Sequence, residues 1–592
     1  MKYSLITDVY EEIEATTKRL EMTDFLVDLL KETPKEVVDK VVYLTQGKLY
    51  PDYVGIELGV ADKLAVKAIA TSTGRQEREV EEDFAKSGDL GETAANLLTK
   101  KTQATLFRQP LTVEAVYDAF DRIAHATGPG SIDLKVKYLC SLLNDSSPRE
   151  AKYILRMGLG KLRLGVADMT LLDALSVAYG GGKEAREALE RAYNLSSDLG
   201  LVAKTVAHQG LEGIKRFKIT VGRPIRPMLA ERLSSAEEIF EKAGEKVAAE
   251  YKYDGLRLQA HISRKEVLLF SRRLENITDQ FPDACKYIKD SVKAKEAIVE
   301  SECIAVDPDT GEMLPFQMIS QRRGRKYEIE KMAGEIPVAV FFFDVLYADG
   351  VDYTLYTYLD RRRELERIIS KTERAQISAQ LITGDAEQLD RYMNQAISEG
   401  CEGLMIKSIG PDSIYKAGAR GWAWIKYKRE YKSEMTDAVD LVVVGAFHGR
   451  GKRAGTYGAL LLAAYDEDAD VFHTVCKCGS GFTDEDLAKL LEMLKPYKIS
   501  HRHARVDSKL TPDVWFTLGV VLEVIGAEIT LSPVHSCCAN AVRLGSGFAI
   551  RFPRFTGNYR LDKAPEDATT AKEILEMYQS QLKKITKEVV AT

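Results

Sequence analysis

The sequence predicts three consecutive domains: an all-α domain over residues 1–215, a mixed α and β domain over 216–430, and a β-barrel with a final helix over 431–592. At about 150 residues per domain, 592 residues are enough for three or four domains. Apolar residues recur at helix spacing in the first third, whereas short β-branched and aromatic runs dominate the rest. The pattern changes at the proline-stiffened stretch Arg223-Pro-Ile-Arg-Pro227, which marks the first boundary.

The first domain is predicted to be helical because Leu5, Val9 and Ile13 fall on one helix face. Thr33-Pro-Lys-Glu36 predicts a capped helix start, with Thr33 as the N-cap and proline at the first helical position. Further helices are expected to follow, separated at glycines.

Glycines and cations alternate between two of these helices, in Arg156-Met-Gly-Leu-Gly-Lys-Leu-Arg-Leu-Gly165. Glycine lets backbone N–H groups approach a phosphate closely, and the cations add favourable charge. From this segment alone, the glycines are explained equally well as residues that simply end one helix before the next begins. The residues concerned are Gly158, Gly160, Lys161 and Arg163.

Short apolar runs predict the strands of the second and third domains. In the second domain they are Ala297–Val306, Pro337–Tyr347 and Gly403–Ile406. In the third they are Leu441–Gly445, Leu460–Ala464 and Val520–Val524, separated by glycine-rich turns that suggest a small barrel. Ile574, Leu575, Tyr578, Leu582 and Ile585 predict one amphipathic final helix.

Composition excludes several classes of protein. No apolar run reaches the roughly 20 residues needed to cross a bilayer, and the N-terminus lacks the pattern of a signal peptide, so we expect an intracellular protein. Eight cysteines without a C-x-x-C pair argue against a structural zinc site. The net charge of −6 argues against a protein that coats nucleic acid, so any DNA contact must come from local basic patches. The candidate patches are Arg322–Lys326, Lys426–Arg429 and Arg450–Arg453. Taken singly, each is more readily interpreted as a run of solvated surface charges.

The common phosphate-binding loops and the nucleophile elbow of hydrolases are absent from the sequence. The informative segment is Glu250-Tyr-Lys-Tyr-Asp-Gly-Leu-Arg257, placed where a strand should end. A neutral lysine amine there could attack the α-phosphorus of a nucleotide, and metal ions would then have to neutralise the departing pyrophosphate. Glu302 and Glu402, each on or beside a predicted strand, are the candidate metal ligands.

In these segments the chain resembles the ATP-dependent DNA ligases of the archaeal and eukaryotic replicative type, within the covalent nucleotidyltransferase superfamily. The resemblance spans nearly the whole chain. It is carried by Gly160-Lys-Leu-Arg-Leu-Gly165, Lys252-Tyr-Asp-Gly-Leu-Arg257, Phe270-Ser-Arg-Arg-Leu-Glu-Asn276, Glu300-Ser-Glu302, Phe342-Phe-Asp-Val-Leu-Tyr347, Glu402-Gly-Leu-Met-Ile-Lys407, Trp424-Ile-Lys-Tyr-Lys428, Gly449–Gly458, Glu523–Glu528, Arg551–Phe555 and Arg560-Leu-Asp-Lys563.

The resemblance implies an all-α DNA-binding domain, an α+β adenylation domain with antiparallel sheets, and an OB-fold barrel. It implies three transfers: Lys252 takes AMP from ATP, passes it to the 5′-phosphate of a nick, and the 3′-hydroxyl displaces AMP. It further implies that Lys252, Lys426 and Lys428 are catalytic. The implied ATP-binding set is Glu250, Lys252, Arg257, Arg272, Glu302, Phe343, Lys407, Arg420, Lys426, Lys428, Arg560 and Lys563.

Within that set, Glu250 is expected at the adenine edge and Phe343 against the base. Arg257 and Arg272 would hold ribose or phosphate. Lys426 and Lys428 would clamp the α-phosphate, while Arg560 and Lys563 would orient the pyrophosphate. Glu302 and Glu402 would bind Mg²⁺, with Mn²⁺ as an alternative. Two glutamates in Glu300-Ser-Glu302 leave the first metal ligand ambiguous, and we favour Glu302.

The expected partner is nicked duplex DNA, bound by a monomer that is cytoplasmic and nucleoid-associated if the chain is prokaryotic. The expected DNA contacts are Gly158, Gly160, Lys161, Arg163, Arg450, Lys452 and Arg453. A second expected partner is a sliding clamp, because Gln103-Ala-Thr-Leu-Phe107 resembles a shortened clamp-binding peptide, with Gln103, Leu106 and Phe107 as the contacts. A plain exposed loop is the alternative interpretation of that segment.

Other covalent nucleotidyltransferases, namely RNA ligases and mRNA-capping guanylyltransferases, would share Lys252 and the acidic motifs. The large helical N-terminal domain disfavours both. A DNA-binding scaffold without catalysis is disfavoured because Lys252, both carboxylates and the terminal Arg560-Leu-Asp-Lys563 are all present.

Overall fold

The computed structural model describes the chain apart from residues 101–108, 163, 234, 307–312, 315, 326, 400, 428–437, 450–454, 527, 533, 543–544, 552 and 591–592, with backbone only for 183–184, 317, 394, 397–398, 528, 530, 551 and 581–590. The chain divides into two compact units. One comprises Met1–Glu77 with Ala94–Arg429, and the other Arg78–Thr93 with Glu430–Thr592. The first unit contains most of the predicted helical domain together with the predicted mixed domain, so the three-domain boundaries stay a prediction.

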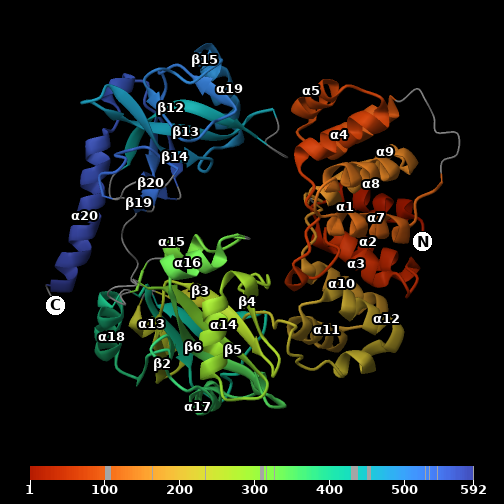
Figure 1. Cartoon of the computed structure of the whole chain (residues 1–592), viewed down its shortest axis with the longest axis vertical. Coiled ribbons are helices and arrows are strands. Elements are labelled where there is room, and N and C mark those ends of the chain that lie inside the picture. Colours follow the sequence, from red (N-terminus) through yellow and green to blue (C-terminus); the bar gives the residue numbers. More distant parts are fainter. Residues whose placement is uncertain are drawn as a thin grey trace. The chain divides into compact units, whose positions relative to one another are not determined.

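The N-terminal region is helical, as predicted, and is drawn from red to yellow in Figure 1. Its helices are α1 (Tyr3–Glu14), α2 (Arg19–Glu32), α3 (Val38–Thr45), α4 (Asp62–Thr73), α5 (Glu77–Ser87), α6 (Leu90–Thr99), α7 (Val113–His125), α8 (Ser131–Asp145), α9 (Pro148–Gly158), α10 (Asp168–Tyr179), α11 (Lys183–Ser196) and α12 (Leu199–Lys215). One prediction is wrong: no helix begins at Thr33, whose hydroxyl donates instead to the Leu29 carbonyl at 2.7 Å, just past the end of α2. Helix α3 begins only at Val38.

The central region contains two sheets. The first sheet has the order β1-β11-β10-β2-β9 and the second β4-β3-β5-β6-β7, with β8 beside β6. Pairing is antiparallel except for β1 with β11 and β6 with β8. The strands are β1 (Leu229–Leu233), β2 (Val247–Lys252), β3 (Leu256–Ile262), β4 (Val267–Ser271), β5 (Ala297–Ala305), β6 (Val338–Ala348), β7 (Val351–Asp352), β8 (Ala375–Ile377), β9 (Gln380–Thr383), β10 (Gly403–Ser408) and β11 (Arg420–Tyr427).

Helices cover these sheets and complete their cores. They are α13 (Ala236–Ala243), α14 (Pro282–Ser291), α15 (Phe316–Ser320), α16 (Ile329–Glu335), α17 (Tyr358–Ile368) and α18 (Ala386–Ser398). Helix α14 lies across the second sheet (Figure 1), where Ala284 and Ile288 join a core with Leu258, Val299 and Phe342. The first sheet has a separate core with α13 and α18. Because both sheets are anchored by buried apolar faces, the polar side chains on their strands start from fixed backbone positions.

The C-terminal region is rich in strands, and its main sheet curls into a half-barrel in which β18 pairs with β12 and β21. Its strands are β12 (Val439–His448), β13 (Tyr457–Asp466), β14 (Val471–Cys478), β15 (Lys498–Ile499), β16 (Val506–Asp507), β17 (Val514–Phe516), β18 (Val521–Ile525), β19 (Glu528–Ser532), β20 (Gly547–Arg551) and β21 (Arg554–Tyr559). Helices α19 (Asp484–Leu494) and α20 (Ala571–Val590) complete it. The fold class and the final helix are therefore confirmed.

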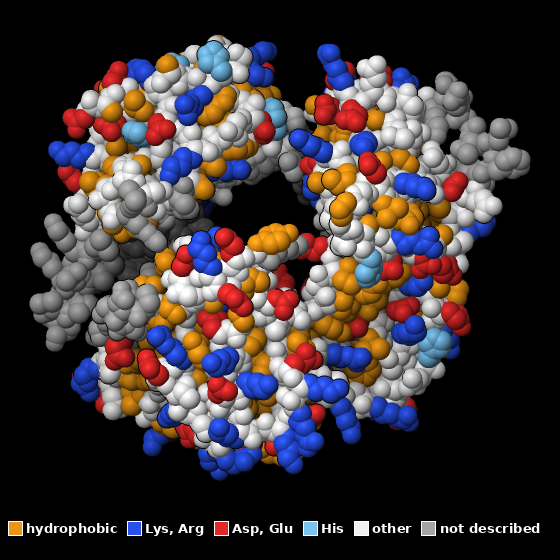
Figure 2. Space-filling model, in the orientation of Figure 1, with side chains coloured by type: hydrophobic (Ala, Val, Ile, Leu, Met, Phe, Trp, Pro, Cys, Tyr) orange, Lys and Arg blue, Asp and Glu red, His pale blue; other side chains and the backbone are white. Residues whose placement is uncertain are grey.

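Charge is mixed on the molecular surface. Figure 2 shows Lys and Arg side chains interspersed with Asp and Glu over the face in view, as expected from 83 basic and 89 acidic residues. None of the helices in the described part of the chain has the length and apolar character needed to cross a membrane. All eight cysteines are free thiols.

Candidate active site

Neighbouring strands of the first sheet bring the predicted nucleophile next to two other predicted segments. Strand β2 ends at Lys252, opposite Gly403 at the start of β10, so the preceding Glu402 lies beside Lys252. The backbone N–H of Glu402 donates to the carbonyl of Lys252 at 2.8 Å. On the other edge of β10, Met405 is paired with Lys426 of β11. The strand register therefore gathers three motifs that are far apart in the sequence.

Gly255 allows the turn after Lys252 to lie against β5. A Cβ atom at this position would stand 2.5 Å from the carbonyl oxygen of Cys303 and 3.0 Å from Cγ of Glu302. Any side chain would therefore force the turn away from the strand. The glycine of the K-x-D-G motif is required here because it keeps Asp254 and Lys252 close to Glu302.

Acidic side chains surround the amine of Lys252. Its Nζ forms an ion pair with the carboxylate of Glu402, and both side chains are partly buried. Asp254 accepts a hydrogen bond from the backbone N–H of Phe316 at 3.2 Å. Burial and the contact with Glu402 raise the pKa of Asp254. The lysine thus lies among carboxylates that interact with one another.

Glu302 is the third carboxylate of this group. Burial raises the pKa of Glu302 to about 7, and the charges of Glu402 and Asp254 add to the shift, whereas Lys252 and Arg257 oppose it. Carboxylates that repel one another in a partly desolvated site form a place that a cation would stabilise.

Glu300 has a different role from its neighbour. It is 1% exposed, and its carboxylate accepts hydrogen bonds from Arg257 at 2.8 and 2.9 Å and from the Tyr415 hydroxyl at 3.0 Å. Because these partners already satisfy Glu300, it is a structural ion-pair partner. Of the two glutamates in the motif, Glu302 is therefore the better candidate metal ligand.

Glu250 and Lys407 form a buried ion pair between β2 and β10. Nζ of Lys407 lies 2.8 Å from the Glu250 carboxylate and donates to the Phe343 carbonyl at the same distance. Arg362 donates to Glu250 at 3.0 Å, and the Tyr358 hydroxyl donates to it as well. Since Lys407 reaches across to β6, it ties the first sheet to the second at Phe343.

Aromatic rings and cations surround Phe343. Its half-buried ring lies 5.1 Å from Nζ of Lys407 and 5.5 Å from the Arg257 guanidinium carbon, and its edge meets Trp424 with centroids 6.1 Å apart. Because the ring is only half-buried, part of it is accessible to a flat base that could stack on it.

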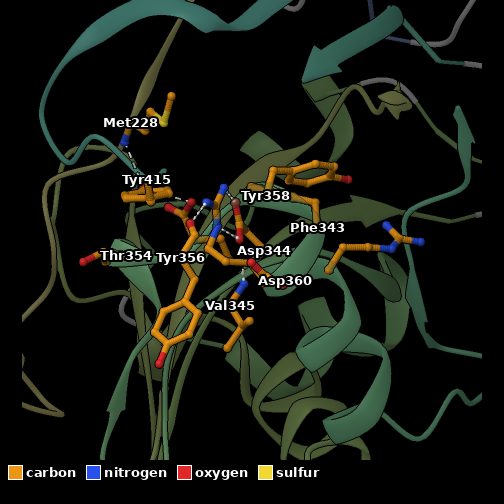
Figure 3. A network of polar contacts seen from close by, with 12 residues as sticks. Met228, Phe343, Asp344, Val345, Thr354, Tyr356, Tyr358, Asp360 and Tyr415 are labelled. Atoms are coloured by element: carbon orange, nitrogen blue, oxygen red, sulfur yellow. Dashed lines mark hydrogen bonds and ion pairs between the residues drawn. The ribbon is translucent and has the colours of Figure 1, made fainter. Parts of the chain in front are cut away.

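Asp344, the residue after Phe343, belongs to a buried polar network (Figure 3). Its carboxylate accepts from Nε and Nη2 of Arg361 at 2.7 and 3.0 Å. Nη1 of Arg361 donates to the carbonyls of Tyr356 and Ser413, each at 2.9 Å. Arg361 therefore fixes β6, α17 and the segment before β11 in one arrangement.

Arg257 and Arg272, both predicted to contact ribose or phosphate, line one small pocket. Its other lining residues are Pro227, Gln259, Ser271, Leu274 and Glu300. Arg272 is exposed in the turn after β4, whereas Arg257 is held on β3. Arg420 is exposed at the start of β11, where it pairs with Leu229 of β1.

Comparison with protein families matches nearly all of these segments. The ATP dependent DNA ligase domain matches residues 227–428, the DNA ligase N terminus 2–176, and the ATP dependent DNA ligase C terminal region 453–563. A DNA ligase 2 of Thermofilum pendens is 58% identical over 98% of both chains, and a DNA ligase of Staphylothermus marinus is 52% identical over 99% of this chain and 100% of its own. The chain belongs to the ATP-dependent DNA ligases.

Nick sealing with ATP is the known activity of this family, so the predicted enzyme class is confirmed over the RNA ligase, capping enzyme and scaffold alternatives. A solved structure named Pmar-Lig_PreS3 shares the fold of the ligase. It has a TM-score of 0.53 at 16% identity and covers 94% of this chain and 99% of its own.

Two predicted pyrophosphate contacts of the ligase lie in the C-terminal unit and share one partner there. Arg560 and Lys563 approach the carboxylate of Asp440 at 2.6 and 2.7 Å, and Arg560 also pairs with Asp562 at 2.9 Å. Both cations are therefore neutralised within their own unit, and an incoming phosphate would have to compete with Asp440.

The described part of the predicted DNA-binding segment follows α9. Gly158 ends that helix, and a Cβ there would meet the Phe120 ring at 3.5 Å. Gly160 has φ of +64° and open space around its Cα, and Lys161 pairs with Asp62 at 2.9 Å. The remaining predictions for DNA, clamp and phosphate contacts lie outside the described residues, namely Arg163, Arg450, Lys452, Arg453, Gln103, Leu106, Phe107 and Lys428.

Two buried arginines of the ligase were missed from sequence. Arg322, in a predicted surface patch, is 1% exposed and bonds bidentately to Asp283 at 2.6 and 2.8 Å, so its interpretation as a solvated cation is wrong. Arg361 lies in Tyr358-Leu-Asp-Arg-Arg-Arg363, which resembles an exposed charged helix. The signal in the sequence that this helix is partly buried was Tyr358, an aromatic residue at its start.

The acidic group of the ligase suits a magnesium ion that keeps other ligands. Among the described residues, no group of three or more His, Cys, Asp or Glu side chains is arranged to hold a metal ion by itself. Mg²⁺ binds through one or two carboxylates, with water and phosphate oxygens completing its shell. Glu302 and Glu402 supply carboxylates of that kind beside Lys252, so the residues fit Mg²⁺ bound together with ATP.

Proposed function

We propose that Lys252 is the residue of this ligase that carries AMP between ATP and the 5′-phosphate of a nick. The supporting observation is the placement of Nζ at the end of β2, paired with Glu402 and beside Asp254 and Glu302. The amine forms a bond to the α-phosphorus while the bond to the bridging oxygen of pyrophosphate breaks. Glu402 accepts the hydrogen bond from Nζ and is placed to receive its proton.

Glu302 and Glu402 would hold Mg²⁺ during this first transfer. Bound Mg²⁺ would neutralise the charge of the departing pyrophosphate. Lys426 of β11 is aligned through Met405 of β10 with Glu250, two residues before Lys252 on β2, and we propose that it contacts the α-phosphate. We propose the same role for Lys428, and propose that Arg560 and Lys563 orient the pyrophosphate.

The nucleotide pocket is proposed to form around Phe343, with adenine stacked on its open side. Arg257 and Arg272 would hold the ribose or a phosphate because they line one pocket. Glu250 has its carboxylate bound by Lys407, Arg362 and Tyr358, so we propose that it serves the adenine edge by fixing these side chains beside Phe343. Arg420, exposed at the rim of β11, remains a proposed ATP contact.

Nicked duplex DNA would be gripped through its phosphate backbone, indifferent to sequence. Gly160 supports this proposal because its backbone is open and its neighbour Lys161 supplies a cation. The other proposed DNA contacts are Gly158, Arg163, Arg450, Lys452 and Arg453. We also propose that the ligase has three domains and binds DNA as a monomer.

A sliding clamp is proposed as a second partner through Gln103, Leu106 and Phe107. Binding to the cognate clamp would be measured by surface plasmon resonance with wild-type ligase and with the Gln103→Ala, Phe107→Ala double variant. Unchanged binding by the double variant would end this proposal.

The nucleophile is tested with Lys252→Ala and with Lys246→Ala as the matched control, because Lys246 is exposed just before the same strand. Each protein is incubated with ATP labelled in the α-phosphate and then with nicked duplex DNA. Lys252→Ala should form no covalent AMP and seal no nick, while Lys246→Ala should match wild type. Covalent AMP on another side chain, or sealing without Lys252, would refute the proposal.

A further inference from the structure

The guanidinium of Arg257 is held by three acceptors, and one of them, the Tyr415 hydroxyl, also contacts the residues of the other two. Its Nη1 donates to the Met228 carbonyl at 3.0 Å, and its Nη2 donates to Glu300 at 2.8 and 2.9 Å and to the Tyr415 hydroxyl at 3.4 Å. The same hydroxyl donates to Glu300 at 3.0 Å and accepts from the backbone N–H of Met228 at 2.9 Å. The Tyr415 hydroxyl therefore contacts Arg257 and both of its other partners, Glu300 and Met228.

We infer that Tyr415 is a positioning residue that sets the place of Arg257 in the nucleotide pocket. A tyrosine hydroxyl has one donor and two acceptor positions, and Glu300, Met228 and Arg257 use all three. Burial raises the pKa of Tyr415, which keeps the proton that it donates to Glu300. The inference rests on the proposed role of Arg257 as a nucleotide contact.

Tyr415 is itself held from two other directions. Its backbone N–H donates to the Thr354 carbonyl at 3.1 Å, and the two residues lie close together in Figure 3. Its ring lies 5.8 Å from the guanidinium carbon of Arg361, which also donates to the carbonyl of Ser413 two residues earlier. The hydroxyl therefore has a fixed position and can transmit it to a longer, more flexible side chain.

A displaced Arg257 would disturb base and ribose binding together. Its guanidinium carbon lies 5.5 Å from the Phe343 ring and 5.4 Å from the Trp424 ring, so it forms part of the wall on which the base is proposed to stack. Losing the Tyr415 hydroxyl would leave the ring and the fold in place but would free Glu300 and Arg257 to shift. The expected defect is in ATP binding and not in the transfer itself.

The test is Tyr415→Phe, with Tyr356→Phe as the control because the Tyr356 ring is exposed near the same network. Initial rates of covalent AMP formation are measured over a range of ATP concentrations. For Tyr415→Phe we expect KM for ATP to rise about five- to tenfold, with kcat changed less than about twofold, as for loss of one hydrogen bond used in binding. A KM equal to that of wild type and of Tyr356→Phe would overturn the inference.

To test whether Tyr415 acts through Arg257, the Tyr415→Phe substitution is repeated in an Arg257→Lys background. Lysine keeps a cation beside Glu300 but removes the planar guanidinium. In that background Tyr415→Phe should raise KM less than about twofold, because interacting residues are not additive. An equal rise in both backgrounds would overturn the inference while leaving the role of Arg257 intact. If Arg257→Lys alone left KM unchanged, the proposed role of Arg257 would fall, and the inference with it.

Discussion

The Nζ atom of Lys252 forms an ion pair with the carboxylate of Glu402, and the backbone N–H of Glu402 donates to the Lys252 carbonyl at 2.8 Å. The two residues are thus joined through both backbone and side chain where β2 and β10 meet. A lysine that would otherwise be flexible therefore has a defined position, as the proposed attack on a phosphorus requires.

Glu402→Gln should slow the formation of covalent AMP by about 100-fold, the scale of loss for a group that moves a proton or stabilises charge in a transition state. Glutamine keeps the shape and one oxygen but removes the negative charge beside Lys252. Single-turnover reactions with labelled ATP measure the rate. Glu399→Gln is the control, since Glu399 is exposed and binds the Tyr251 hydroxyl outside the site. A rate within about threefold of wild type would contradict the assignment.

The same substitution, Glu to Gln, should affect a different property at Glu302 and at Glu300. Glu302→Gln should raise the Mg²⁺ concentration needed for half-maximal adenylation by about tenfold, with little loss of stability. Glu300→Gln should lower the free energy of unfolding by about 3 kcal/mol, because it leaves Arg257 as an uncompensated buried cation. Magnesium titration and urea unfolding measure the two effects. If Glu300→Gln changed the magnesium requirement and Glu302→Gln did not, the metal assignment would be reversed.

Arg361→Lys should destabilise the first unit by about 3 kcal/mol although the charge is kept. Lysine cannot replace the paired bonds to Asp344 or reach both backbone carbonyls that Arg361 binds. Arg363→Lys, two residues later and 76% exposed, should change the free energy of unfolding by less than about 0.5 kcal/mol. Equal stability of the two variants in urea would show that the buried network contributes little.

The sequence predicts Lys252, Glu402 and Lys426 as members of one site because each lies in a recognisable local motif, and β2, β10 and β11 are neighbours in one sheet, while the roles of these residues stay a prediction. The predicted apolar runs match β5, which carries Glu302, β6, which carries Phe343, and β10, which follows Glu402, whereas β2 and β11 were not among them. The start of α3 was misplaced because Thr33 and Pro34 mimic a helix cap, while the hydroxyl of Thr33 bonds back to α2.

Arg361 and Arg322 could not be predicted in the same way. Their burial depends on partners 17 and 39 residues away, Asp344 and Asp283, which only tertiary packing brings close. Local charge patterns favour exposure for such residues. For Glu300 and Glu302, alternation on a strand placed both on one face, and only the contacts of Arg257 and Tyr415 distinguish them.

His261 should make the first unit sensitive to mild acid. Burial lowers the pKa of His261 to about 3, whereas a histidine in the unfolded chain titrates near 6.5. Nδ1 of its neutral ring accepts from the backbone N–H of Gly222 at 2.9 Å, and its Nε2 lies 3.0 Å from the Gln259 side-chain oxygen. Between these two pKa values only the unfolded state takes up a proton, so the free energy of unfolding falls as the pH falls below about 6.5.

From pH 6.5 to pH 5 this single group should lower the free energy of unfolding by about 2 kcal/mol. His261→Gln removes the titrating group while keeping an acceptor for Gly222, so its urea unfolding should depend less on pH over the same range by that amount. His501→Gln is the control for the substitution itself, because it makes the same change at an exposed histidine of the other unit. If all three proteins lost stability equally between pH 6.5 and 5, then His261 would have to accept its proton in the folded state as readily as in the unfolded state, which would contradict a buried, neutral ring that accepts from the backbone N–H of Gly222.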